Sequence, residues 1–136
     1  LGKTHDYVRL ALDGMDKVGI ARAMIGVDKT NAQAQRALKD HPDRFFGSYH
    51  VNPNLGMEGV RDLVHAYDTW GIKAASAFPA GNCPQVPIND KKYYPLYAKC
   101  VELDVTFAST VGVTGPRIPF APQLVHYLDE FCWFSP

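Results

Sequence analysis

Segments with the pattern of helices alternate with segments with the pattern of strands along the whole chain. Apolar runs typical of strands occupy residues 20–27, 45–51, 72–78 and 105–113. They begin roughly every 25 to 35 residues, which is the length of a strand with its crossover helix. Helical apolar spacing predicts helices over residues 7–18, 31–39, 60–70, 95–103 and 124–132. Because parallel strands need such crossovers, this alternation predicts an α/β fold with a parallel sheet.

Local signals place the ends of these elements. Thr4 is the expected N-cap of the first helix, and Gly19 and Gly71 are expected to end the first and third helices. The first strand is too apolar to be half exposed, so we expect helices or other elements to cover both of its faces.

Two architectures fit this order of elements, an open doubly wound sheet and part of a (β/α)₈ barrel. The connections that follow the strands are rich in polar residues and in residues with special backbone geometry. They are DKT at 28–30, HVNPN at 50–54, PAGN at 79–82 and TGPR at 114–117. The connections that follow the helices are short and plain. This asymmetry indicates one functional face, at the carboxyl ends of the strands.

Length and charge exclude several classes of protein. The 136 residues carry 14 basic and 14 acidic side chains, and 46% of the residues are hydrophobic. That length predicts one domain with a real core, whereas the balanced charge lacks the footprint of a nucleic-acid or membrane-surface binder. No apolar run approaches 18 residues, and the N-terminus lacks the apolar core of a signal peptide.

The cysteines indicate a reducing compartment. Cys83, Cys100 and Cys132 are odd in number, far apart and without a CxxC pair. A disulfide framework or a zinc knuckle would show a denser, paired set. We therefore expect free thiols and a cytoplasmic location. The chain also lacks the Walker A, GxGxxG, HExxH and GxSxG motifs, so phosphate-binding loops, zincins and nucleophile-elbow hydrolases have no support.

Two side chains stand out as candidates for chemistry. His50 ends a predicted strand next to the loop-rich face, where a neutral imidazole could bind a metal or exchange a proton near neutral pH. We interpret it as a residue that lines a substrate pocket. Arg117 follows Gly115 and Pro116, and a guanidinium held there could bind a carboxylate through two hydrogen bonds or could fix its own loop. The other histidines are interpreted as surface or structural residues.

Five segments, taken in order, resemble the amidohydrolase-related (amidohydrolase 2) family. They read GMDKVGIARAMI, HPDRFFGSYHVNPN, GIKAASAFPAG, YYPLYAKCVELDVTF and STVGVTGPRIPFAPQLVHYLDEFCWF. The last segment is similar to an uncharacterised branch of the relatives of the aminocarboxymuconate-semialdehyde and resorcylate decarboxylases. Each motif is mild, but their order and spacing extend over nearly the whole chain.

The resemblance implies a (β/α)₈ barrel of about 250 residues or more that binds one divalent metal, commonly zinc. The family's first metal motif, His-x-His, has no match here, and its late aspartate ligand would follow the last residue of this chain. A metal-binding histidine that the family often carries after the fifth strand is replaced by Thr110. A threonine hydroxyl is a poor substitute for imidazole on zinc, so these residues alone support no metal site.

On this alignment the chain covers about strands two to five, as one segment (residues 1–136) of a larger barrel domain. Half a barrel leaves two sheet edges unpaired and its interior unfilled. Three explanations are open. The chain is a fragment of a larger parent protein, segments of the parent are missing from the sequence, or the half-barrel assembles with another copy. The first two together are favoured.

The resemblance implies a metal-dependent hydrolase of a small, carboxylated substrate. The alternatives are a non-oxidative decarboxylase on the same scaffold and a non-catalytic α/β module that binds a ligand or self-associates. The predicted substrate-binding residues are His50, Arg117, Asn52, Lys29 and Thr110. The family's catalytic ligands would lie outside these residues, so we expect the segment alone to be inactive. Neither nucleic acid nor a membrane is an expected partner.

Overall fold

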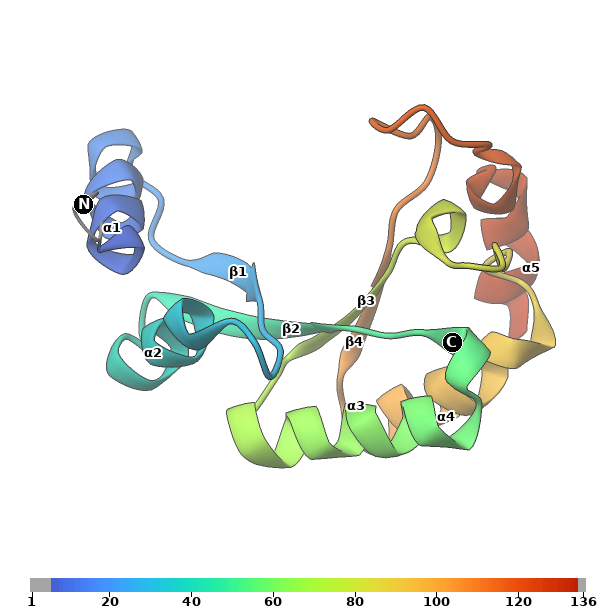
Figure 1. Ribbon diagram of the computed structural model, residues 1–136, viewed down its shortest axis with the longest axis horizontal. Coiled ribbons are helices and arrows are strands. Elements are labelled where there is room, and N and C mark those ends of the chain that lie inside the picture. Colours follow the sequence, from blue (N-terminus) through green and yellow to red (C-terminus); the bar gives the residue numbers. More distant parts are fainter. Residues whose placement is uncertain (1–5, 135–136) are drawn as a thin grey trace.

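The computed structural model describes residues 6–134, with the backbone only at Phe131 and Phe134. Within these residues, helices and strands alternate as predicted (Figure 1). The helices are α1 (Tyr7–Val18), α2 (Ala32–Asp40), α3 (Met57–Trp70), α4 (Tyr94–Glu102) and α5 (His126–Phe134), and the strands are β1 (Ala23–Gly26), β2 (Phe45–His50), β3 (Ala74–Ala77) and β4 (Thr106–Ser109). Single turns of 3₁₀ helix lie at Pro53–Leu55, Pro79–Gly81, Lys91–Tyr93 and Ala121–Gln123.

The four strands form one sheet in the order β1-β2-β3-β4, and every neighbouring pair is parallel. A doubly wound sheet reverses its strand order at a switch point, and the described strands show no such reversal. Each strand lies beside the one before it, as in a (β/α)₈ barrel. The described chain is therefore part of a barrel, which confirms the predicted fold class.

The core lies between the sheet and the helices on its outer side. In Figure 1, α3 and α4 run below the sheet, while α1 and α2 lie at the β1 end. The larger cluster includes Leu63 of α3, Ile72 and Leu96, all at most 1% exposed. A smaller cluster joins Met15 of α1 to Phe45 of β2. The crossover helices thus cover one face of the sheet only.

The helix ends follow the predicted glycines. Gly19 and Gly71 end α1 and α3 in the left-handed conformation, with φ of 72° and 59°, where a side chain would be strained. Asp6 caps α1, because its carboxylate accepts a hydrogen bond of 3.3 Å from the backbone N–H of Arg9. The predicted cap, Thr4, lies outside the described residues.

The strands are shorter than the apolar runs predicted. The N–H of Ile20 bonds to the carbonyl of Met15 at 2.9 Å, so the run 20–27 begins as the end of a helix. Gly112 has a φ of 86°, and its N–H bonds to the carbonyl of Gln123 at 2.8 Å, which turns the chain away after β4. Apolar composition alone cannot separate a strand from the turns that flank it.

The expectation that β1 is covered on both faces is wrong. Burial alternates along this strand, and Met24 is 48% exposed. Ala23 and Ile25 pack against α1 and α2, whereas Met24 projects from the opposite face. That face is the interior side of the barrel. Its apolar residues therefore follow the sequence pattern of a buried strand, although no described residue covers Met24.

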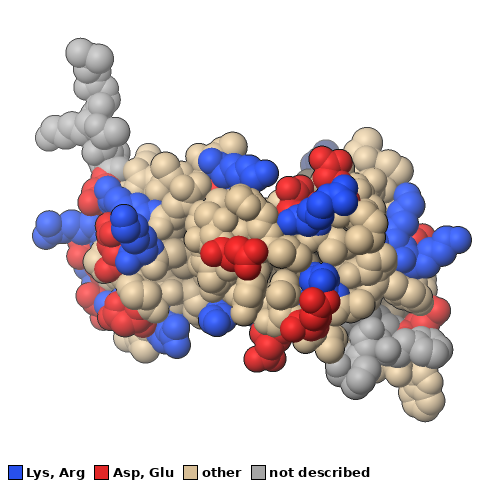
Figure 2. Space-filling model, turned by 90° about the horizontal axis from the view of Figure 1, so that it is seen from below, with Lys and Arg blue, Asp and Glu red and all other residues tan. Residues whose placement is uncertain are grey.

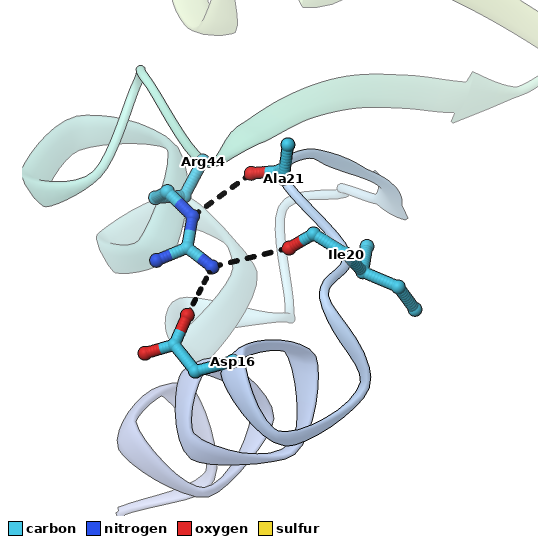
Figure 3. Close-up of polar contacts among 4 residues, drawn as sticks. All are labelled: Asp16, Ile20, Ala21 and Arg44. Carbon is cyan, nitrogen blue, oxygen red and sulfur yellow. Dashed lines mark hydrogen bonds and ion pairs between the residues drawn. The ribbon is translucent and has the colours of Figure 1, made fainter.

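Arg44 fixes the junction between α1, β1 and β2 (Figure 3). Its Nε donates to the carbonyl of Ala21 at 2.9 Å, and one terminal nitrogen donates to the carbonyl of Ile20 at 3.3 Å. The same nitrogen pairs with the carboxylate of Asp16 at 2.6 Å. The guanidinium thereby connects the end of α1 to the entrance of β1.

The outer helical surface carries mixed charge. Seen from the side of α3 and α4, acidic and basic side chains are interspersed over an apolar and neutral background (Figure 2). No extended area of one sign is visible on this face, which agrees with its role as a solvated outer layer. Within residues 6–134, no helix is both long enough and apolar enough to cross a membrane.

Candidate functional site

The register of the sheet separates an outer face from an inner face. Tyr49 pairs with Ala75, and Ala75 pairs with Phe107; these residues share the face that packs on the helices. Side chains alternate along a strand, so the residues next to them point to the other face. There His50 of β2 pairs with Ser76 of β3, which brings a ring and a hydroxyl into one inner row.

His50 stands at the carboxyl end of β2. The N–H of Val51 bonds to the carbonyl of Ser76 at 2.8 Å, so β2 remains paired with β3 beyond this point. Burial lowers the pKa of His50 below its ordinary value of 6.5, which keeps the ring mainly neutral at pH 7. Within residues 6–134 no hydrogen bond or ion pair engages the imidazole, so both nitrogens are available to a ligand.

Two serines that are absent from the predicted site extend the polar inner surface. Ser76 donates a long hydrogen bond of 3.4 Å to the carbonyl of Tyr49. Ser48, two residues before His50 on β2, is 3% exposed, and its hydroxyl has no hydrogen-bond partner among the described residues. The available signal was the alternation Ser48, His50 in a strand, which puts both side chains on one face.

Asn52 and Lys29 have structural contacts. The side chain of Asn52 accepts a hydrogen bond from the N–H of Asn54 at 3.0 Å and so caps the turn Pro53–Leu55. The ammonium of Lys29 lies 3.6 Å from the carboxylate of Asp62 on α3. This ion pair holds the tip of Lys29 beside a covering helix. Both residues lie near the carboxyl ends of the strands, but their described contacts shape loops.

Asp28 begins the loop after β1 as a turn residue. Its carboxylate accepts hydrogen bonds from the hydroxyl and the N–H of Thr30, both at 2.6 Å, and from the N–H of Asn31 at 3.0 Å. These bonds, led by the Thr30 hydroxyl, lower the pKa of Asp28. The carboxylate is thereby committed to the turn before α2, whose N-cap is Asn31.

Thr110 and Arg117 belong to the loop that follows β4. The N–H of Thr110 bonds to the carbonyl of Ala77 at 3.1 Å, so Thr110 continues the β4 ladder past the last assigned strand residue. Arg117 is exposed, and the structure shows no hydrogen bond or ion pair to its guanidinium within residues 6–134. The hydroxyl of Thr114 donates to the carbonyl of Pro116 at 2.7 Å, which tightens the turn before Arg117.

Two glutamines, absent from the predicted site, hold the loops at the carboxyl ends together. The fully buried side chain of Gln123 donates to the carbonyl of Gly112 at 2.9 Å and accepts from the N–H of Ala80 at 3.3 Å. Gln85 donates to the carbonyls of Ala80 and Pro119 at 2.7 and 2.8 Å. They connect the loops after β3 and β4. No sequence motif marks such a role for an amide side chain.

Comparison with known families agrees with this geometry. The amidohydrolase family model matches residues 7–132, which is almost the whole chain. The chain belongs to the amidohydrolase family. The resemblance drawn from the sequence motifs is thus confirmed. No curated protein sequence matches the chain significantly.

Solved structures show the same fold. A 2,6-dihydroxybenzoate decarboxylase has a TM-score of 0.64 at 13% identity, over 88% of this chain and 48% of its own. An uncharacterized TIM-barrel protein of Bordetella bronchiseptica has a TM-score of 0.61 at 20% identity, over 89% and 43%. A 5-carboxyvanillate decarboxylase of Novosphingobium aromaticivorans, with bound manganese, has 0.59 at 19%, over 72% and 33%. This amidohydrolase chain therefore spans less than half the length of these barrels.

The described residues do not fit a metal site by themselves. Residues 6–134 contain no group of three His, Cys, Asp or Glu side chains placed to hold an ion. Asp28, at the carboxyl end of β1, already accepts three hydrogen bonds from its own loop. Among the described residues, His50 therefore belongs to no group of three side chains of the kind that hold zinc or manganese.

Proposed function

We propose that this amidohydrolase chain forms one side of a barrel active site that hydrolyses a small, carboxylated substrate. The observation that carries the proposal is the inner row of His50 and Ser76 at the carboxyl ends of parallel strands. Barrel enzymes place their chemistry at that end. The row combines a neutral imidazole with a hydroxyl, while the outer face of the same strands is apolar core.

His50 would act as an acid or a base. Its lowered pKa leaves an unprotonated ring nitrogen at pH 7 that can accept a proton from a water molecule attacking the substrate carbonyl. The resulting imidazolium then returns that proton to the leaving group when its bond to the carbonyl carbon breaks. Ser76 would hold a substrate oxygen by a hydrogen bond, because its long bond to Tyr49 is weak and readily exchanged.

Arg117 would bind the carboxylate of the substrate. A guanidinium that makes no internal ion pair can form two parallel hydrogen bonds with a carboxylate. Thr110 would lie on the same side of the pocket, at the end of β4. Asn52 and Lys29 would contribute less, because the described contacts of both are to neighbouring loop and helix residues.

Decarboxylation is the second candidate reaction. The similar structures include two decarboxylases, together with a 4-oxalomesaconate hydratase and an uncharacterized TIM-barrel protein. In that reaction the bond from the substrate to its carboxyl carbon breaks, CO₂ leaves, and the electron pair remains on carbon and takes up a proton. His50 would supply that proton only from its protonated imidazolium form, and would return to the neutral ring. Hydrolysis and decarboxylation thus make different demands on the same ring.

We further propose that the four strands take positions two to five of the barrel, and that the catalytic metal ligands come from its other strands. The described residues supply no complete ligand set for a metal. The chain alone would then bind the substrate weakly without turning it over. Its three free cysteines support a reducing cytoplasm as its location.

Calorimetric titration with 2,6-dihydroxybenzoate tests this site. We expect weak, millimolar binding that His50→Gln lowers at least about tenfold, through loss of a ring contact of the order of 1.4 kcal/mol. Lys73→Gln is the matched control, because Lys73 is exposed at the amino end of β3. Absence of binding to the unmodified chain, or equal loss in both variants, would contradict the proposal. In a completed barrel, release of CO₂ from the same compound would identify decarboxylation.

A further inference from the structure

The loop after β4 closes on itself at its base. It turns away from the strand at Gly112 and returns at Gln123, the last residue of a short 3₁₀ turn. The N–H of Gly112 donates to the carbonyl of Gln123 at 2.8 Å, and the side-chain amide of Gln123 donates to the carbonyl of Gly112 at 2.9 Å. Residues 112–123 therefore form an Ω-loop, a surface loop of roughly 6 to 16 residues whose ends meet. Figure 1 shows it beyond the carboxyl end of β4.

The Ω-loop is anchored to the loop that follows β3. Gln123 is fully buried, and its amide oxygen accepts a hydrogen bond from the N–H of Ala80 at 3.3 Å. The carbonyl of Pro119 accepts from the side chain of Gln85 at 2.8 Å, and the same amide nitrogen donates to the carbonyl of Ala80 at 2.7 Å. These bonds fix the Ω-loop relative to the carboxyl ends of the strands.

The backbone on both sides of Arg117 is held as well. The N–H of Ile118 donates to the carbonyl of Pro116 at 2.9 Å, which closes a three-residue γ-turn centred on Arg117. The hydroxyl of Thr114 donates to the same carbonyl at 2.7 Å and, more weakly, to the carbonyl of Ile118 at 3.3 Å. A single side chain thus contacts the carbonyls that flank Arg117.

The guanidinium takes no part in this scaffold. Arg117 is exposed, and no residue within 6–134 accepts a hydrogen bond from its side chain. An arginine that served only to fix its loop would bond to the carbonyls of that loop, but Thr114 and Gln123 make those bonds instead. A charge that is uncommitted, on a backbone that is already ordered, binds a ligand at a smaller entropy cost.

From these contacts we propose that Thr114 and Gln123 are positioning residues that preform a carboxylate-binding site at Arg117. Gln123 sets where the Ω-loop leaves the sheet, and Thr114 sets the direction of the turn that carries the guanidinium. A planar carboxylate can accept two parallel hydrogen bonds from this group, whereas a neutral amide of the same shape cannot. The inference rests on the proposed function, in which Arg117 binds the substrate carboxylate. It adds that selectivity for a carboxylate depends on two residues that do not touch the substrate.

Selectivity between 2,6-dihydroxybenzoate and 2,6-dihydroxybenzamide tests the inference, because the two ligands differ only at the carboxylate. In NMR titrations the unmodified chain should prefer the carboxylate at least about tenfold, and Arg117→Gln should remove the preference. Thr114→Val, which deletes the hydroxyl and keeps the shape, should reduce the preference at least about threefold, whereas Thr114→Ser should retain it. Thr106→Val is the matched control, because Thr106 is exposed at the amino end of β4.

Hydrogen exchange gives a readout that needs no ligand. The amides of Gly112 and Ile118 donate within the Ω-loop, so both should exchange at least about tenfold more slowly than in an unstructured peptide. Thr114→Val should speed exchange at Ile118, and Gln123→Met should speed it at Gly112. Since Gln123 is fully buried, circular dichroism must show that its variant is folded, and the Thr114 variants decide the inference by themselves.

The outcomes separate this inference from the proposed function. Unprotected amides at Gly112 and Ile118 in the unmodified chain would overturn the inference, as would an unchanged preference in Thr114→Val. Equal affinity of the unmodified chain for the two ligands would also overturn it, while leaving the binding face around His50 intact. If neither ligand binds, the proposed function itself fails, and the inference fails with it.

Discussion

The position of a side chain on the pleat decides its role in this chain. Tyr49 and His50 are neighbours in sequence, but Tyr49 packs against the outer core and His50 faces inward. The same alternation puts the unpartnered hydroxyl of Ser48 on the inner face. Chemistry at this site therefore depends on every second residue of a short strand.

The pH dependence of stability tests the environment of the His50 ring. Because burial lowers the pKa of His50, the unfolded chain binds a proton more readily than the folded one as the pH falls below 6.5. Stability should therefore decrease through that range, and His50→Gln should flatten the decrease. The pKa of Asp28 is lowered from 3.8, so protonation of its carboxylate affects stability only at lower pH and does not overlap with the His50 titration. A midpoint for the His50 ring above 6.5 in an NMR titration would contradict the assignment.

Thiol reactivity is a second test. Cys100 is 3% exposed, and burial raises its pKa from 9.0 to about 11, so its thiolate is scarce at pH 8. Cys83 and Cys132 are exposed. A maleimide or Ellman's reagent should modify the two exposed thiols rapidly and Cys100 only when the protein unfolds. Rapid modification of all three in the folded chain would contradict the burial of Cys100, which lies on the core-facing side of α4.

At the scale of elements, close backbone approaches position the site. The start of α3 lies against the loop that carries Asn52, and Gly59 makes this contact possible. A Cβ at Gly59 would lie 2.9 Å from the carbonyl oxygen of Asn52. That loop follows directly after His50. The close approach of α3 at Gly59 therefore helps to fix the position of the end of β2, where His50 lies.

Gly59→Ala tests this packing. We expect it to lower the free energy of unfolding by about 1–3 kcal/mol, because backbone must shift to relieve the contact. Gly14→Ala in α1 is the matched control: nothing lies within 4 Å of its Cβ, and alanine should stabilise the helix by about 0.5–1 kcal/mol. Urea denaturation measures both. Equal effects of the two substitutions would exclude steric contact at Gly59 as the cause.

Sequence patterns predicted the helices, their glycine ends and the parallel sheet, because these depend on local periodicity. They overestimated the length of β4. The chain turns away after this strand at the left-handed Gly112, whose N–H bonds to a residue eleven positions later, Gln123. They identified His50 from its place at a strand end. They missed Ser48, Gln85 and Gln123, because these roles arise from burial and from contacts between distant loops.

At the scale of the molecule, four parallel strands with helices on one side form part of an amidohydrolase barrel. The exposed inner face of β1 and the two open edges have the same origin: each needs further strands to be covered. The other strands of the barrel would supply this cover and would enclose the inner row of His50 and Ser76.

If the inner face at the carboxyl ends of the strands is the binding face, residue-resolved NMR during titration with 2,6-dihydroxybenzoate should locate the ligand there. We expect the largest amide shift changes at His50, Ser76 and Thr110, with little change at Lys73 and Thr106, which lie at the amino ends. Changes concentrated at those amino ends or on the outer helices would contradict the claim.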